Sequence, residues 1–520
     1  MTVERLFEAI GAADGEMIRC AEAPVKKRKK TWRTLAACLV CAVGIGLAGS
    51  FFFGGMGGSA GGGTGDEFSS DGSRVFMSYS GPVLPLTAEG DTADIEAERK
   101  VEFDFSPYLP VEESYEDMGK THTYTRWDSS ALIKDRYVLT NTATEEKTLR
   151  LLYPYKGTME QETPVITVNG SQPALQPYYG DYTGSFIGAW GANHENETLN
   201  LMSVENWEGV QAILESGQYR SAALNRARVV LDQKVVVYAF TNAVAPEVED
   251  RNPTLAMTFT MDYDKTTVLT YGFNGHSWDE ETGYRRCSFS VDEPGTKWAD
   301  QPHFVAVMGE DIEDYTLQGY LDGGCDKGEE LDGVTADVTR YETTLGVLVD
   351  ELLKTEDFNF RYETMYGEEI PTVFPREDYV NAIGEALVQY GPLAEEPMMR
   401  YDTGDLESIF YEPTGYTRVM YLAFEVTLEP GESVEVEAAF RQEGSRDFVG
   451  KNRSLHGYDM MTRVDSNLNF TAQSASVSHY DVIEIVNQNF GFDLAAGIDS
   501  VVLDPAVPHY YMEVERIISE

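Results

Sequence analysis

A run of nineteen uncharged and largely apolar residues occupies positions 35–53. As a helix it would span about 28 Å, close to the roughly 30 Å hydrocarbon core of a bilayer. Five consecutive basic residues, 26–30, precede it and acidic residues dominate after it. The pattern therefore predicts one transmembrane helix, and the positive-inside rule places the N-terminus in the cytoplasm and the bulk of the chain outside the cell membrane.

Beyond this anchor, apolar and polar residues alternate with the period of two that is typical of half-buried strands. The clearest runs begin at Lys100, Ala131, Glu146, Pro164, Lys234, Thr254 and Thr266. Turn residues separate them, which favours antiparallel sheets in two layers. We expect a mainly β protein with some α: a membrane anchor followed by a multi-domain antiparallel β-sandwich ectodomain with inserted helices.

Helical spacing of apolar residues interrupts the strands three times. One helix is expected to begin at Asn206, a plausible N-cap, and to stop at Gly217. The others are expected at 344–354 and 376–390. Near the C-terminus, "RVMYLAFEVTLEPGESVEVEAAF" indicates a hairpin around Pro430, and this final unit is typical of an immunoglobulin-like sandwich.

These signals divide the chain into six parts. They are a cytoplasmic helical segment (1–34), the transmembrane helix (35–53), a Gly/Ser-rich linker (54–72), a β-rich domain (73–250), an α+β domain (251–395) and a β-sandwich-like domain (396–520). The linker composition is that of a flexible tether.

Composition adds a strong charge asymmetry. The chain holds 40 basic and 87 acidic residues, a formal net charge of -47, and its hydrophobic content of 42% is that of a folded protein. Residues 1–34 carry eight basic and five acidic residues. The acidity therefore lies beyond the anchor, where it repels phosphate backbones and excludes nucleic acid as a partner.

Three motif matches near the anchor carry no chemistry. A lipobox cysteine belongs at the end of an apolar stretch, whereas Cys38 lies at its start. The glycines within 44–49 form no dinucleotide site because they lie inside the spanning helix, and Ser59 lies in a glycine run that supplies no nucleophile turn.

The anchor region leaves two further points open. Small residues at 48–50 and 58–60 are compatible with a cleaved signal peptide, although the long segment before the apolar run favours a retained anchor. Ala42, Gly46 and Ser50 form a small-residue stripe that would permit a homodimer through the transmembrane helix.

The cytoplasmic segment has apolar residues at helical spacing, Leu6, Phe7 and Ile10, and again at Met17 and Ile18. Two such short helices need a partner or the membrane surface for stability. With the basic run and the spanning helix, the arrangement resembles clostridial-type single-pass envelope proteins with a short anti-sigma-factor-like cytoplasmic N-terminus. The phrases "YVLTNTATEEKTLRLLYPY", "DYTLQGYLDGG" and "EIVNQNFGFDL" are similar to outer parts found behind such anchors. The resemblance implies a cytoplasmic protein partner for residues 1–34.

Candidates for metal or redox chemistry are few. The histidines stand singly, without zinc-site spacing, at 122, 194, 276, 303, 456, 479 and 509. Outside the membrane, Cys287 and Cys325 form either a disulfide or two buried thiols. The acidic segment "DGGCDKGEELDG" offers five oxygen ligands for Ca²⁺, or else a solvated acidic turn; they are Asp322, Asp326, Glu329, Glu330 and Asp332.

Two aromatic, glycine-rich stretches are candidate ligand platforms. Their exposed faces would be supplied by Tyr178, Tyr179, Tyr182 and Trp190 in one stretch and by Trp278 and Tyr284 in the other. Flat rings beside polar groups suit sugars and peptides, while the alternative is that the rings fill the sandwich cores.

Taken together, the sequence favours a non-enzymatic, membrane-anchored extracytoplasmic binding or sensing protein of a Gram-positive cell envelope, with a cell-wall polymer as a candidate ligand. The resemblance of the cytoplasmic segment implies an anti-sigma-like signalling role. The alternatives are a cell-wall glycan- or peptide-processing enzyme, for which no catalytic residue can be chosen among so many acids, and an adhesive spacer.

Overall fold

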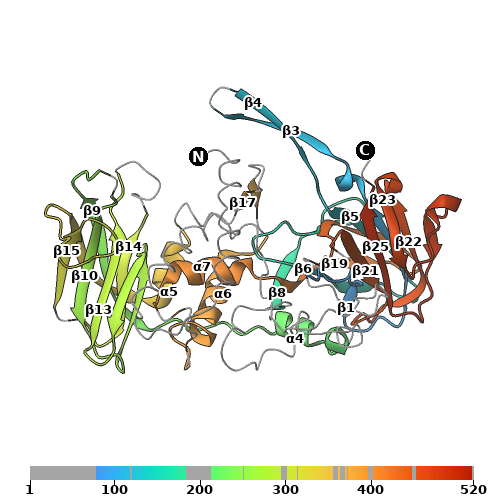
Figure 1. The fold of residues 1–520 in the computed structure, drawn as a ribbon. Coiled ribbons are helices and arrows are strands. Elements are labelled where there is room, and N and C mark those ends of the chain that lie inside the picture. Colours follow the sequence, from blue (N-terminus) through green and yellow to red (C-terminus); the bar gives the residue numbers. More distant parts are fainter. Residues whose placement is uncertain are drawn as a thin grey trace, which may run out of the picture. The chain divides into compact units, whose positions relative to one another are not determined.

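The computed structural model describes residues 78–517 with gaps, all within the compact unit Gly57–Glu520. The residues left out of that range are 118–119, 183–211, 250, 294–300, 313, 355–360, 364–368, 372, 396, 398–400, 402 and 448–452. The described chain is mainly β, with several antiparallel sheets and a few helices, which confirms the expected class (Figure 1). None of the helices in these residues is long and apolar enough to cross a membrane, and the expected segments 1–34, 35–53 and 54–72 lie outside them.

Two sheets pack face to face in a first β-sandwich. Its strands are β1 (Thr87–Glu89), β2 (Ile95–Asp104), β5 (Ser130–Asn141), β6 (Lys147–Gly157), β7 (Val165–Val168), β8 (Gln176–Tyr182), β19 (Arg418–Leu428), β20 (Ser433–Glu443), β22 (Asn469–Ser478) and β24 (Ser500–Val502). One sheet has the order β1-β6-β19-β8 and the other β24-β22-β2-β5-β20-β7. Apolar side chains from both sheets, such as Leu151, Met420 and Val436, share one core.

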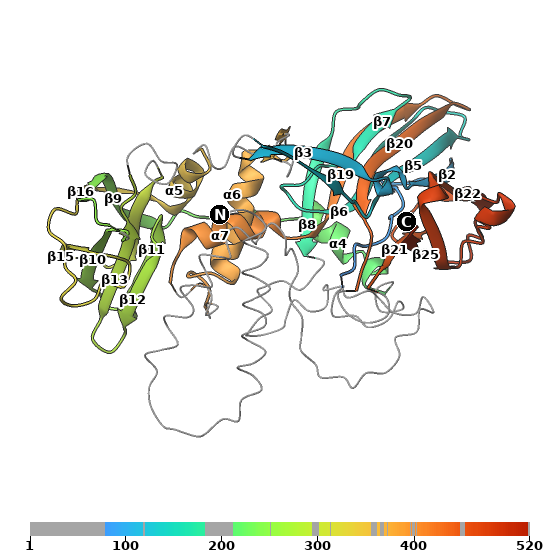
Figure 2. The same ribbon diagram turned by 45° about the horizontal axis from the view of Figure 1, so that its top comes forward.

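Strands from opposite ends of the chain share these two sheets. β6 pairs with β19 and β5 with β20, both antiparallel, and β2 pairs with β22 in parallel. Figures 1 and 2 show the blue N-terminal strands among the orange and red C-terminal ones. Segments 78–182 and 418–502, which lie in the expected parts 73–250 and 396–520, therefore build the first sandwich jointly.

The expected hairpin around Pro430 is wrong, although both of its strands exist. β19 and β20 do not pair with each other: β19 lies between β6 and β8, and β20 lies between β5 and β7. The turn carries the chain from one sheet of the sandwich to the other. β19 does not form a hairpin with β20 because its residues from Arg418 to Phe424 are all buried, so that this strand needs cover on both faces.

A second sandwich is built from consecutive strands. They are β9 (Lys234–Val244), β10 (Thr254–Thr260), β11 (Thr266–Tyr271), β12 (Gly275–Asp279), β13 (Tyr284–Ser290), β14 (His303–Gly309), β15 (Tyr315–Tyr320) and β16 (Thr335–Thr344). The two antiparallel sheets have the orders β11-β14-β9-β16 and β12-β13-β10-β15 (Figure 2). Met257, Phe289 and Val305 belong to the core between them.

The remaining strands form smaller sheets. β21 (Leu455–Met461), β25 (His509–Arg516) and β23 (Ile483–Gln488) make a three-stranded sheet, and two hairpins are formed by β3 (Val111–Asp117) with β4 (Lys120–Arg126) and by β17 (Arg361–Glu363) with β18 (Glu369–Pro371). Short 3-10 turns occur at Ser106–Tyr108, Tyr480–Val482 and Leu494–Ala496. The three-stranded sheet packs on β2 and β22 through a core that contains Phe103, Val477 and Met512.

Four helices lie wholly within the described residues: α4 (Gln218–Leu224), α5 (Leu345–Leu352), α6 (Arg376–Gln389) and α7 (Leu406–Gly415). The helices expected at 344–354 and 376–390 are confirmed as α5 and α6. The Thr344 side chain caps α5 by accepting a hydrogen bond from the Val347 amide. The start of the helix expected from Asn206 lies outside the described residues. Residues 212–215 of that helix are helical, and Gly217, where the helix was expected to stop, has φ 69°.

An ion pair lies inside the first sandwich. The Arg99 guanidinium donates to the Asp135 carboxylate at 2.8 Å through two nitrogens, and both side chains are fully buried. The Tyr137 and Tyr153 hydroxyls also donate to Asp135, at 2.6 and 3.3 Å. Arg99 further donates to the Met461 carbonyl at 2.6 Å, so this network joins N-terminal and C-terminal segments.

Candidate functional site

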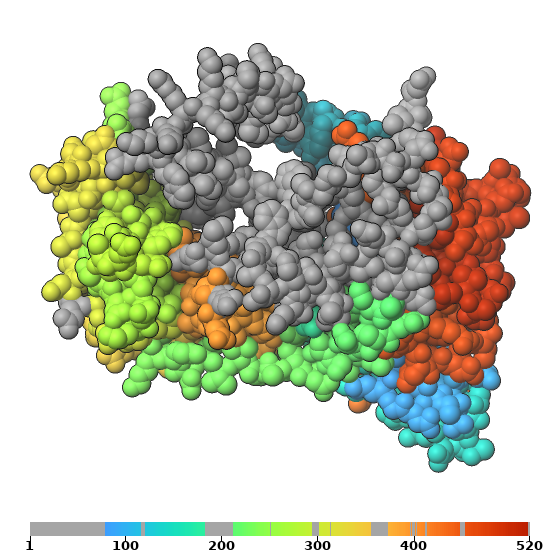
Figure 3. All heavy atoms as spheres, turned by 60° about the horizontal axis from the view of Figure 1, so that its bottom comes forward, coloured from blue at the N-terminus to red at the C-terminus, as the bar shows by residue number. Residues whose placement is uncertain are grey.

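The outer face of the sheet β1-β6-β19-β8 holds a small recess. Along β6, Leu151, Tyr153 and Tyr155 point into the core between the two sheets. The alternate residues Leu152, Pro154 and Lys156 point outward, because side chains alternate across a strand. Their partners on β19 are Ala423, Tyr421 and Val419, which share the same face. Helix α4 covers this face, and the space-filling view shows its green residues at the surface (Figure 3).

The recess between α4 and the sheet has a volume of about 20 Å³, which is room for roughly one water molecule or a methyl group. Most of its wall is apolar. Its lining residues are Leu84, Pro85, Thr87, Pro154, Leu214, Tyr219, Val419, Tyr421, Val464 and Asp465. They come from five separate stretches of the chain, so the recess exists only once the first sandwich has formed.

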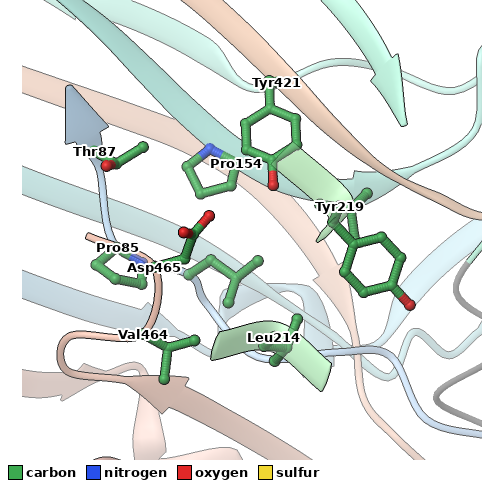
Figure 4. A pocket seen from close by; sticks show the side chains of 10 residues that line it. Pro85, Thr87, Pro154, Leu214, Tyr219, Tyr421, Val464 and Asp465 are labelled. Carbon is green, nitrogen blue, oxygen red and sulfur yellow. The ribbon is translucent and has the colours of Figure 1, made fainter. Parts of the chain in front are cut away.

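An ion pair forms the polar side of the recess. Arg220 on α4 donates to the Asp465 carboxylate at 3.0 Å and to the Asp465 carbonyl at 3.2 Å. The same guanidinium donates to the Thr87 hydroxyl at 3.3 Å. Arg220 therefore ties α4 to β1 and to the loop after β21. Figure 4 shows the Asp465 carboxylate pointing toward Pro154 and Tyr421.

Burial controls the protonation of these groups. It raises the pKa of Asp465 above its usual value, and the charge of Arg220 opposes that rise. Burial also raises the pKa of the Tyr421 phenol, and the Asp465 carboxylate adds to that effect. Tyr421 is therefore a protonated hydroxyl at neutral pH, able to donate a hydrogen bond to an acceptor in the recess.

One residue of the first expected aromatic platform lies beside this recess. Tyr178 on β8 pairs directly with Tyr421 and so shares its face of the sheet. Its hydroxyl accepts a hydrogen bond from Arg150 at 2.6 Å. Tyr182 lies at the end of β8, opposite Arg418, and Trp190 lies outside the described residues.

Tyr179 has a structural role instead. It is buried between two guanidinium groups, with Arg226 at 4.5 Å and Arg418 at 5.3 Å from the ring centre. Its hydroxyl accepts a hydrogen bond from the Asn381 amide at 2.5 Å. Arg226 also pairs with Glu385 of α6 at 2.8 Å, so Tyr179 belongs to the contact that fixes α6 on β8.

The second expected platform is divided between two faces. Trp278 on β12 pairs with Arg285, whereas Tyr284 pairs with Asp279, the next position along. Neighbouring positions on a strand point to opposite sides, so the two rings lie on different faces of the sheet. Trp278 is half exposed and Arg285 lies 5.3 Å from its ring centre.

One arginine forms ion pairs with carboxylates of the acidic loop at 322–332. Arg251 pairs with Asp322 and, at 3.6 Å, with Glu329. Asp322 also accepts from the Gly324 amide at 3.0 Å, and Glu330 accepts from the Gly328 amide at 2.9 Å. Among the described residues, no group of three or more His, Cys, Asp or Glu side chains is arranged to hold a metal ion; this loop, which includes Asp326 and Asp332, is described in full.

Cys287 and Cys325 are two buried free thiols, so the disulfide that the sequence left open is not formed. Strand geometry gives the reason. Cys325 lies against the side of β13 that carries Arg286 and Ser288: Arg286 donates to the Cys325 carbonyl at 3.0 Å. Cys287, between them in sequence, points to the opposite side, into the sandwich core.

No sequence pattern predicted a second polar cluster on the same face as the recess. Lys156 donates to the Tyr79 carbonyl, and burial lowers its pKa to about 8, while the nearby Asp459 and Glu443 carboxylates oppose this. The Tyr79 hydroxyl donates to Asp459 at 2.7 Å, and the His509 ring lies 3.3 Å from the same carboxylate oxygen. These residues are far apart in sequence, and no spacing pattern links them.

No protein-family model matches the chain, and no curated protein is detectably similar to it. A proposal for its function therefore depends on the residues themselves.

Proposed function

We propose that the chain is a single-pass, membrane-anchored extracytoplasmic binding or sensing protein of a Gram-positive cell envelope, without enzymatic activity. Residues 35–53 span the membrane, residues 1–34 lie in the cytoplasm, and the acidic sandwiches, which we class as immunoglobulin-like, lie outside. The apolar run and the charge asymmetry support this topology. As in the clostridial-type envelope proteins that the N-terminus resembles, residues 1–34 engage a cytoplasmic protein partner.

The recess beneath α4 carries the binding part of the proposal. Its apolar wall and its volume of about 20 Å³ suit a methyl-sized group, and Tyr421 and Asp465 supply polar partners beside it. An acetamido group combines a methyl group of that size with an amide that donates and accepts hydrogen bonds. We therefore propose an N-acetylated sugar of a cell-wall polymer as the ligand class.

Binding of solubilised wall polymer to the full-length chain in detergent tests the proposal. The matched ligand control is the same polymer after removal of its acetyl groups. Tyr421→Phe removes one hydroxyl, and we expect a loss of affinity of about three- to tenfold, the value of one hydrogen bond. Tyr341→Phe, on the second sandwich, is the control and should bind normally. Equal binding of the acetylated and the deacetylated polymer would contradict the proposal. Binding of the polymer by Tyr421→Phe as tight as that by Tyr341→Phe and by the unchanged chain would contradict it as well.

The cluster around Lys156 favours one alternative, an enzyme that processes cell-wall glycan or peptide. A lysine with a pKa lowered to about 8, near a carboxylate and a histidine, has the composition of a proton-transfer site. Release of soluble fragments from purified walls would support this alternative, provided that Lys156→Met abolishes the release. Retention of the polymer without fragments supports the binding role.

A further inference from the structure

Three side chains with soft donor atoms lie in one row across the second sandwich. His276 on β12 pairs directly with Cys287 on β13, and Cys287 pairs directly with Met257 on β10. Residues that pair directly in an antiparallel sheet point to the same face, with β-carbons about 4.5–5.5 Å apart. The short cysteine side chain therefore lies between two longer ones, which are able to converge on it.

This row points into the interior of the sandwich. Cys287 and Met257 have no solvent-exposed surface and belong to the core between the two sheets. His276 lies at the edge of that core, because β12 is the outermost strand of its sheet. Few solvent molecules compete for the donor atoms at such a position.

The polar atoms at this edge have unmet hydrogen-bonding capacity. Both ring nitrogens of His276 are buried; the ring interacts with the Phe273 carbonyl, and within the described chain neither nitrogen makes a hydrogen bond of normal geometry. The same holds for Nε of Arg285, two residues before Cys287 on β13, and for Oγ1 of Thr270, on strand β11 of the facing sheet. Buried atoms of this kind normally have a partner, which is often a water molecule or an ion.

We propose that His276, Cys287 and Met257 bind one cuprous ion. Thiolate and thioether sulfur are soft ligands that select Cu(I), and the thioether in particular disfavours the hard ions Mg²⁺ and Ca²⁺. On binding, the Cys287 thiol loses its proton to the solvent and the thiolate forms the sulfur–copper bond, so the charge of the ion is neutralised within the core. No large cavity is needed, because a bare ion occupies less space than a water molecule.

The experiment uses the full-length chain in detergent without oxygen, with Cys20, Cys38 and Cys41 replaced by Ser to remove the thiols outside the described residues. Cuprous ion is supplied as a coloured chelate of known affinity, and the copper withdrawn from the chelate is measured. We expect one ion per chain. Cys287→Ser should abolish this binding, and Met257→Leu, which conserves volume, should weaken it by at least about tenfold.

Cys325→Ser is the matched control, since it removes a second buried thiol on the opposite side of β13 and should leave binding unchanged. Circular dichroism establishes that each variant is folded. A background chain that withdraws no copper would overturn the proposal, as would binding that is equally strong after Cys287→Ser or after Met257→Leu. The site lies in the second sandwich and its probe is the metal alone, so this outcome is independent of the polymer-binding test.

Discussion

The side-chain amide of Asn141 donates a hydrogen bond to the carbonyl oxygen of Leu428 at 3.0 Å, across 287 positions of sequence. Asn141 ends β5 and Leu428 ends β19, and each is followed by a turn that crosses from one sheet of the first sandwich to the other. The Gly431 amide donates to the Asn141 carbonyl at 2.9 Å in return. This contact holds the two crossing turns together.

Replacement of Asn141 by Ala should destabilise the first sandwich. The change removes the side-chain hydrogen bonds to Leu428 and, at 2.8 Å, to the Glu145 carbonyl. Because Asn141 is fully buried, the carbonyls lose partners that water does not easily replace, and we expect a loss of about 1–3 kcal/mol in the free energy of unfolding. Urea denaturation followed by circular dichroism measures it. Asn274→Ala, at an exposed position, should cost less than about 0.5 kcal/mol, and equal effects would contradict the role assigned to Asn141.

Removal of one partner of the Arg99–Asp135 pair should have a larger effect. Asp135→Ala leaves a fully buried guanidinium without its carboxylate, which typically costs about 3–5 kcal/mol. Replacement of both residues by apolar ones, as in Arg99→Met with Asp135→Leu, should recover most of the loss. The free energies of unfolding of the single and double variants provide the comparison. A double variant as unstable as Asp135→Ala would show that the cost comes from packing rather than from the unpaired charge.

His456 should make stability depend on pH in the acidic range. Burial lowers its pKa from 6.5 to about 4 in the folded chain, and the charges of Arg446 and Arg516 add to that effect. Between these two values the unfolded chain binds a proton that the folded chain does not, so the free energy of unfolding decreases as the pH falls. Urea midpoints measured between about pH 7 and pH 5 should fall less steeply for His456→Gln than for the unchanged chain. His122→Gln, on the exposed hairpin, is the control, and identical slopes for the chain and His456→Gln would contradict the prediction.

Most strands could be predicted from the sequence because their periodicity is local. The pairing of each strand with its neighbours could not be predicted, as β19 and β20 illustrate. Pro430 and Gly431 favour a turn in a hairpin and equally in a crossing between sheets, since turn chemistry is the same in both. The available signal was the unbroken apolar run "VMYLAF", which indicates a strand covered on both faces rather than one side of a solvated hairpin.

The recess was predictable only in part. Tyr178 was a candidate from its aromatic, glycine-rich surroundings, and it does lie next to Tyr421. Arg220, Tyr421 and Asp465 come from three distant stretches, and only the strand pairing and the position of α4 bring them together. The two thiols show the same limit. Cys287 points from β13 into the core and Cys325 lies against the other side of that strand, an arrangement that depends on a register that one sequence does not reveal.

The topology is the claim on which the proposed function depends, and cysteine labelling of intact cells tests it most directly. Cys20 is one reporter, and Ser114→Cys, at an exposed position of the hairpin β3–β4, is the other, each in a chain with its remaining cysteines replaced by Ser. We expect a membrane-impermeant maleimide to label Ser114→Cys in intact cells and Cys20 only after lysis. Labelling of Cys20 in intact cells, with Ser114→Cys protected until lysis, would contradict the account.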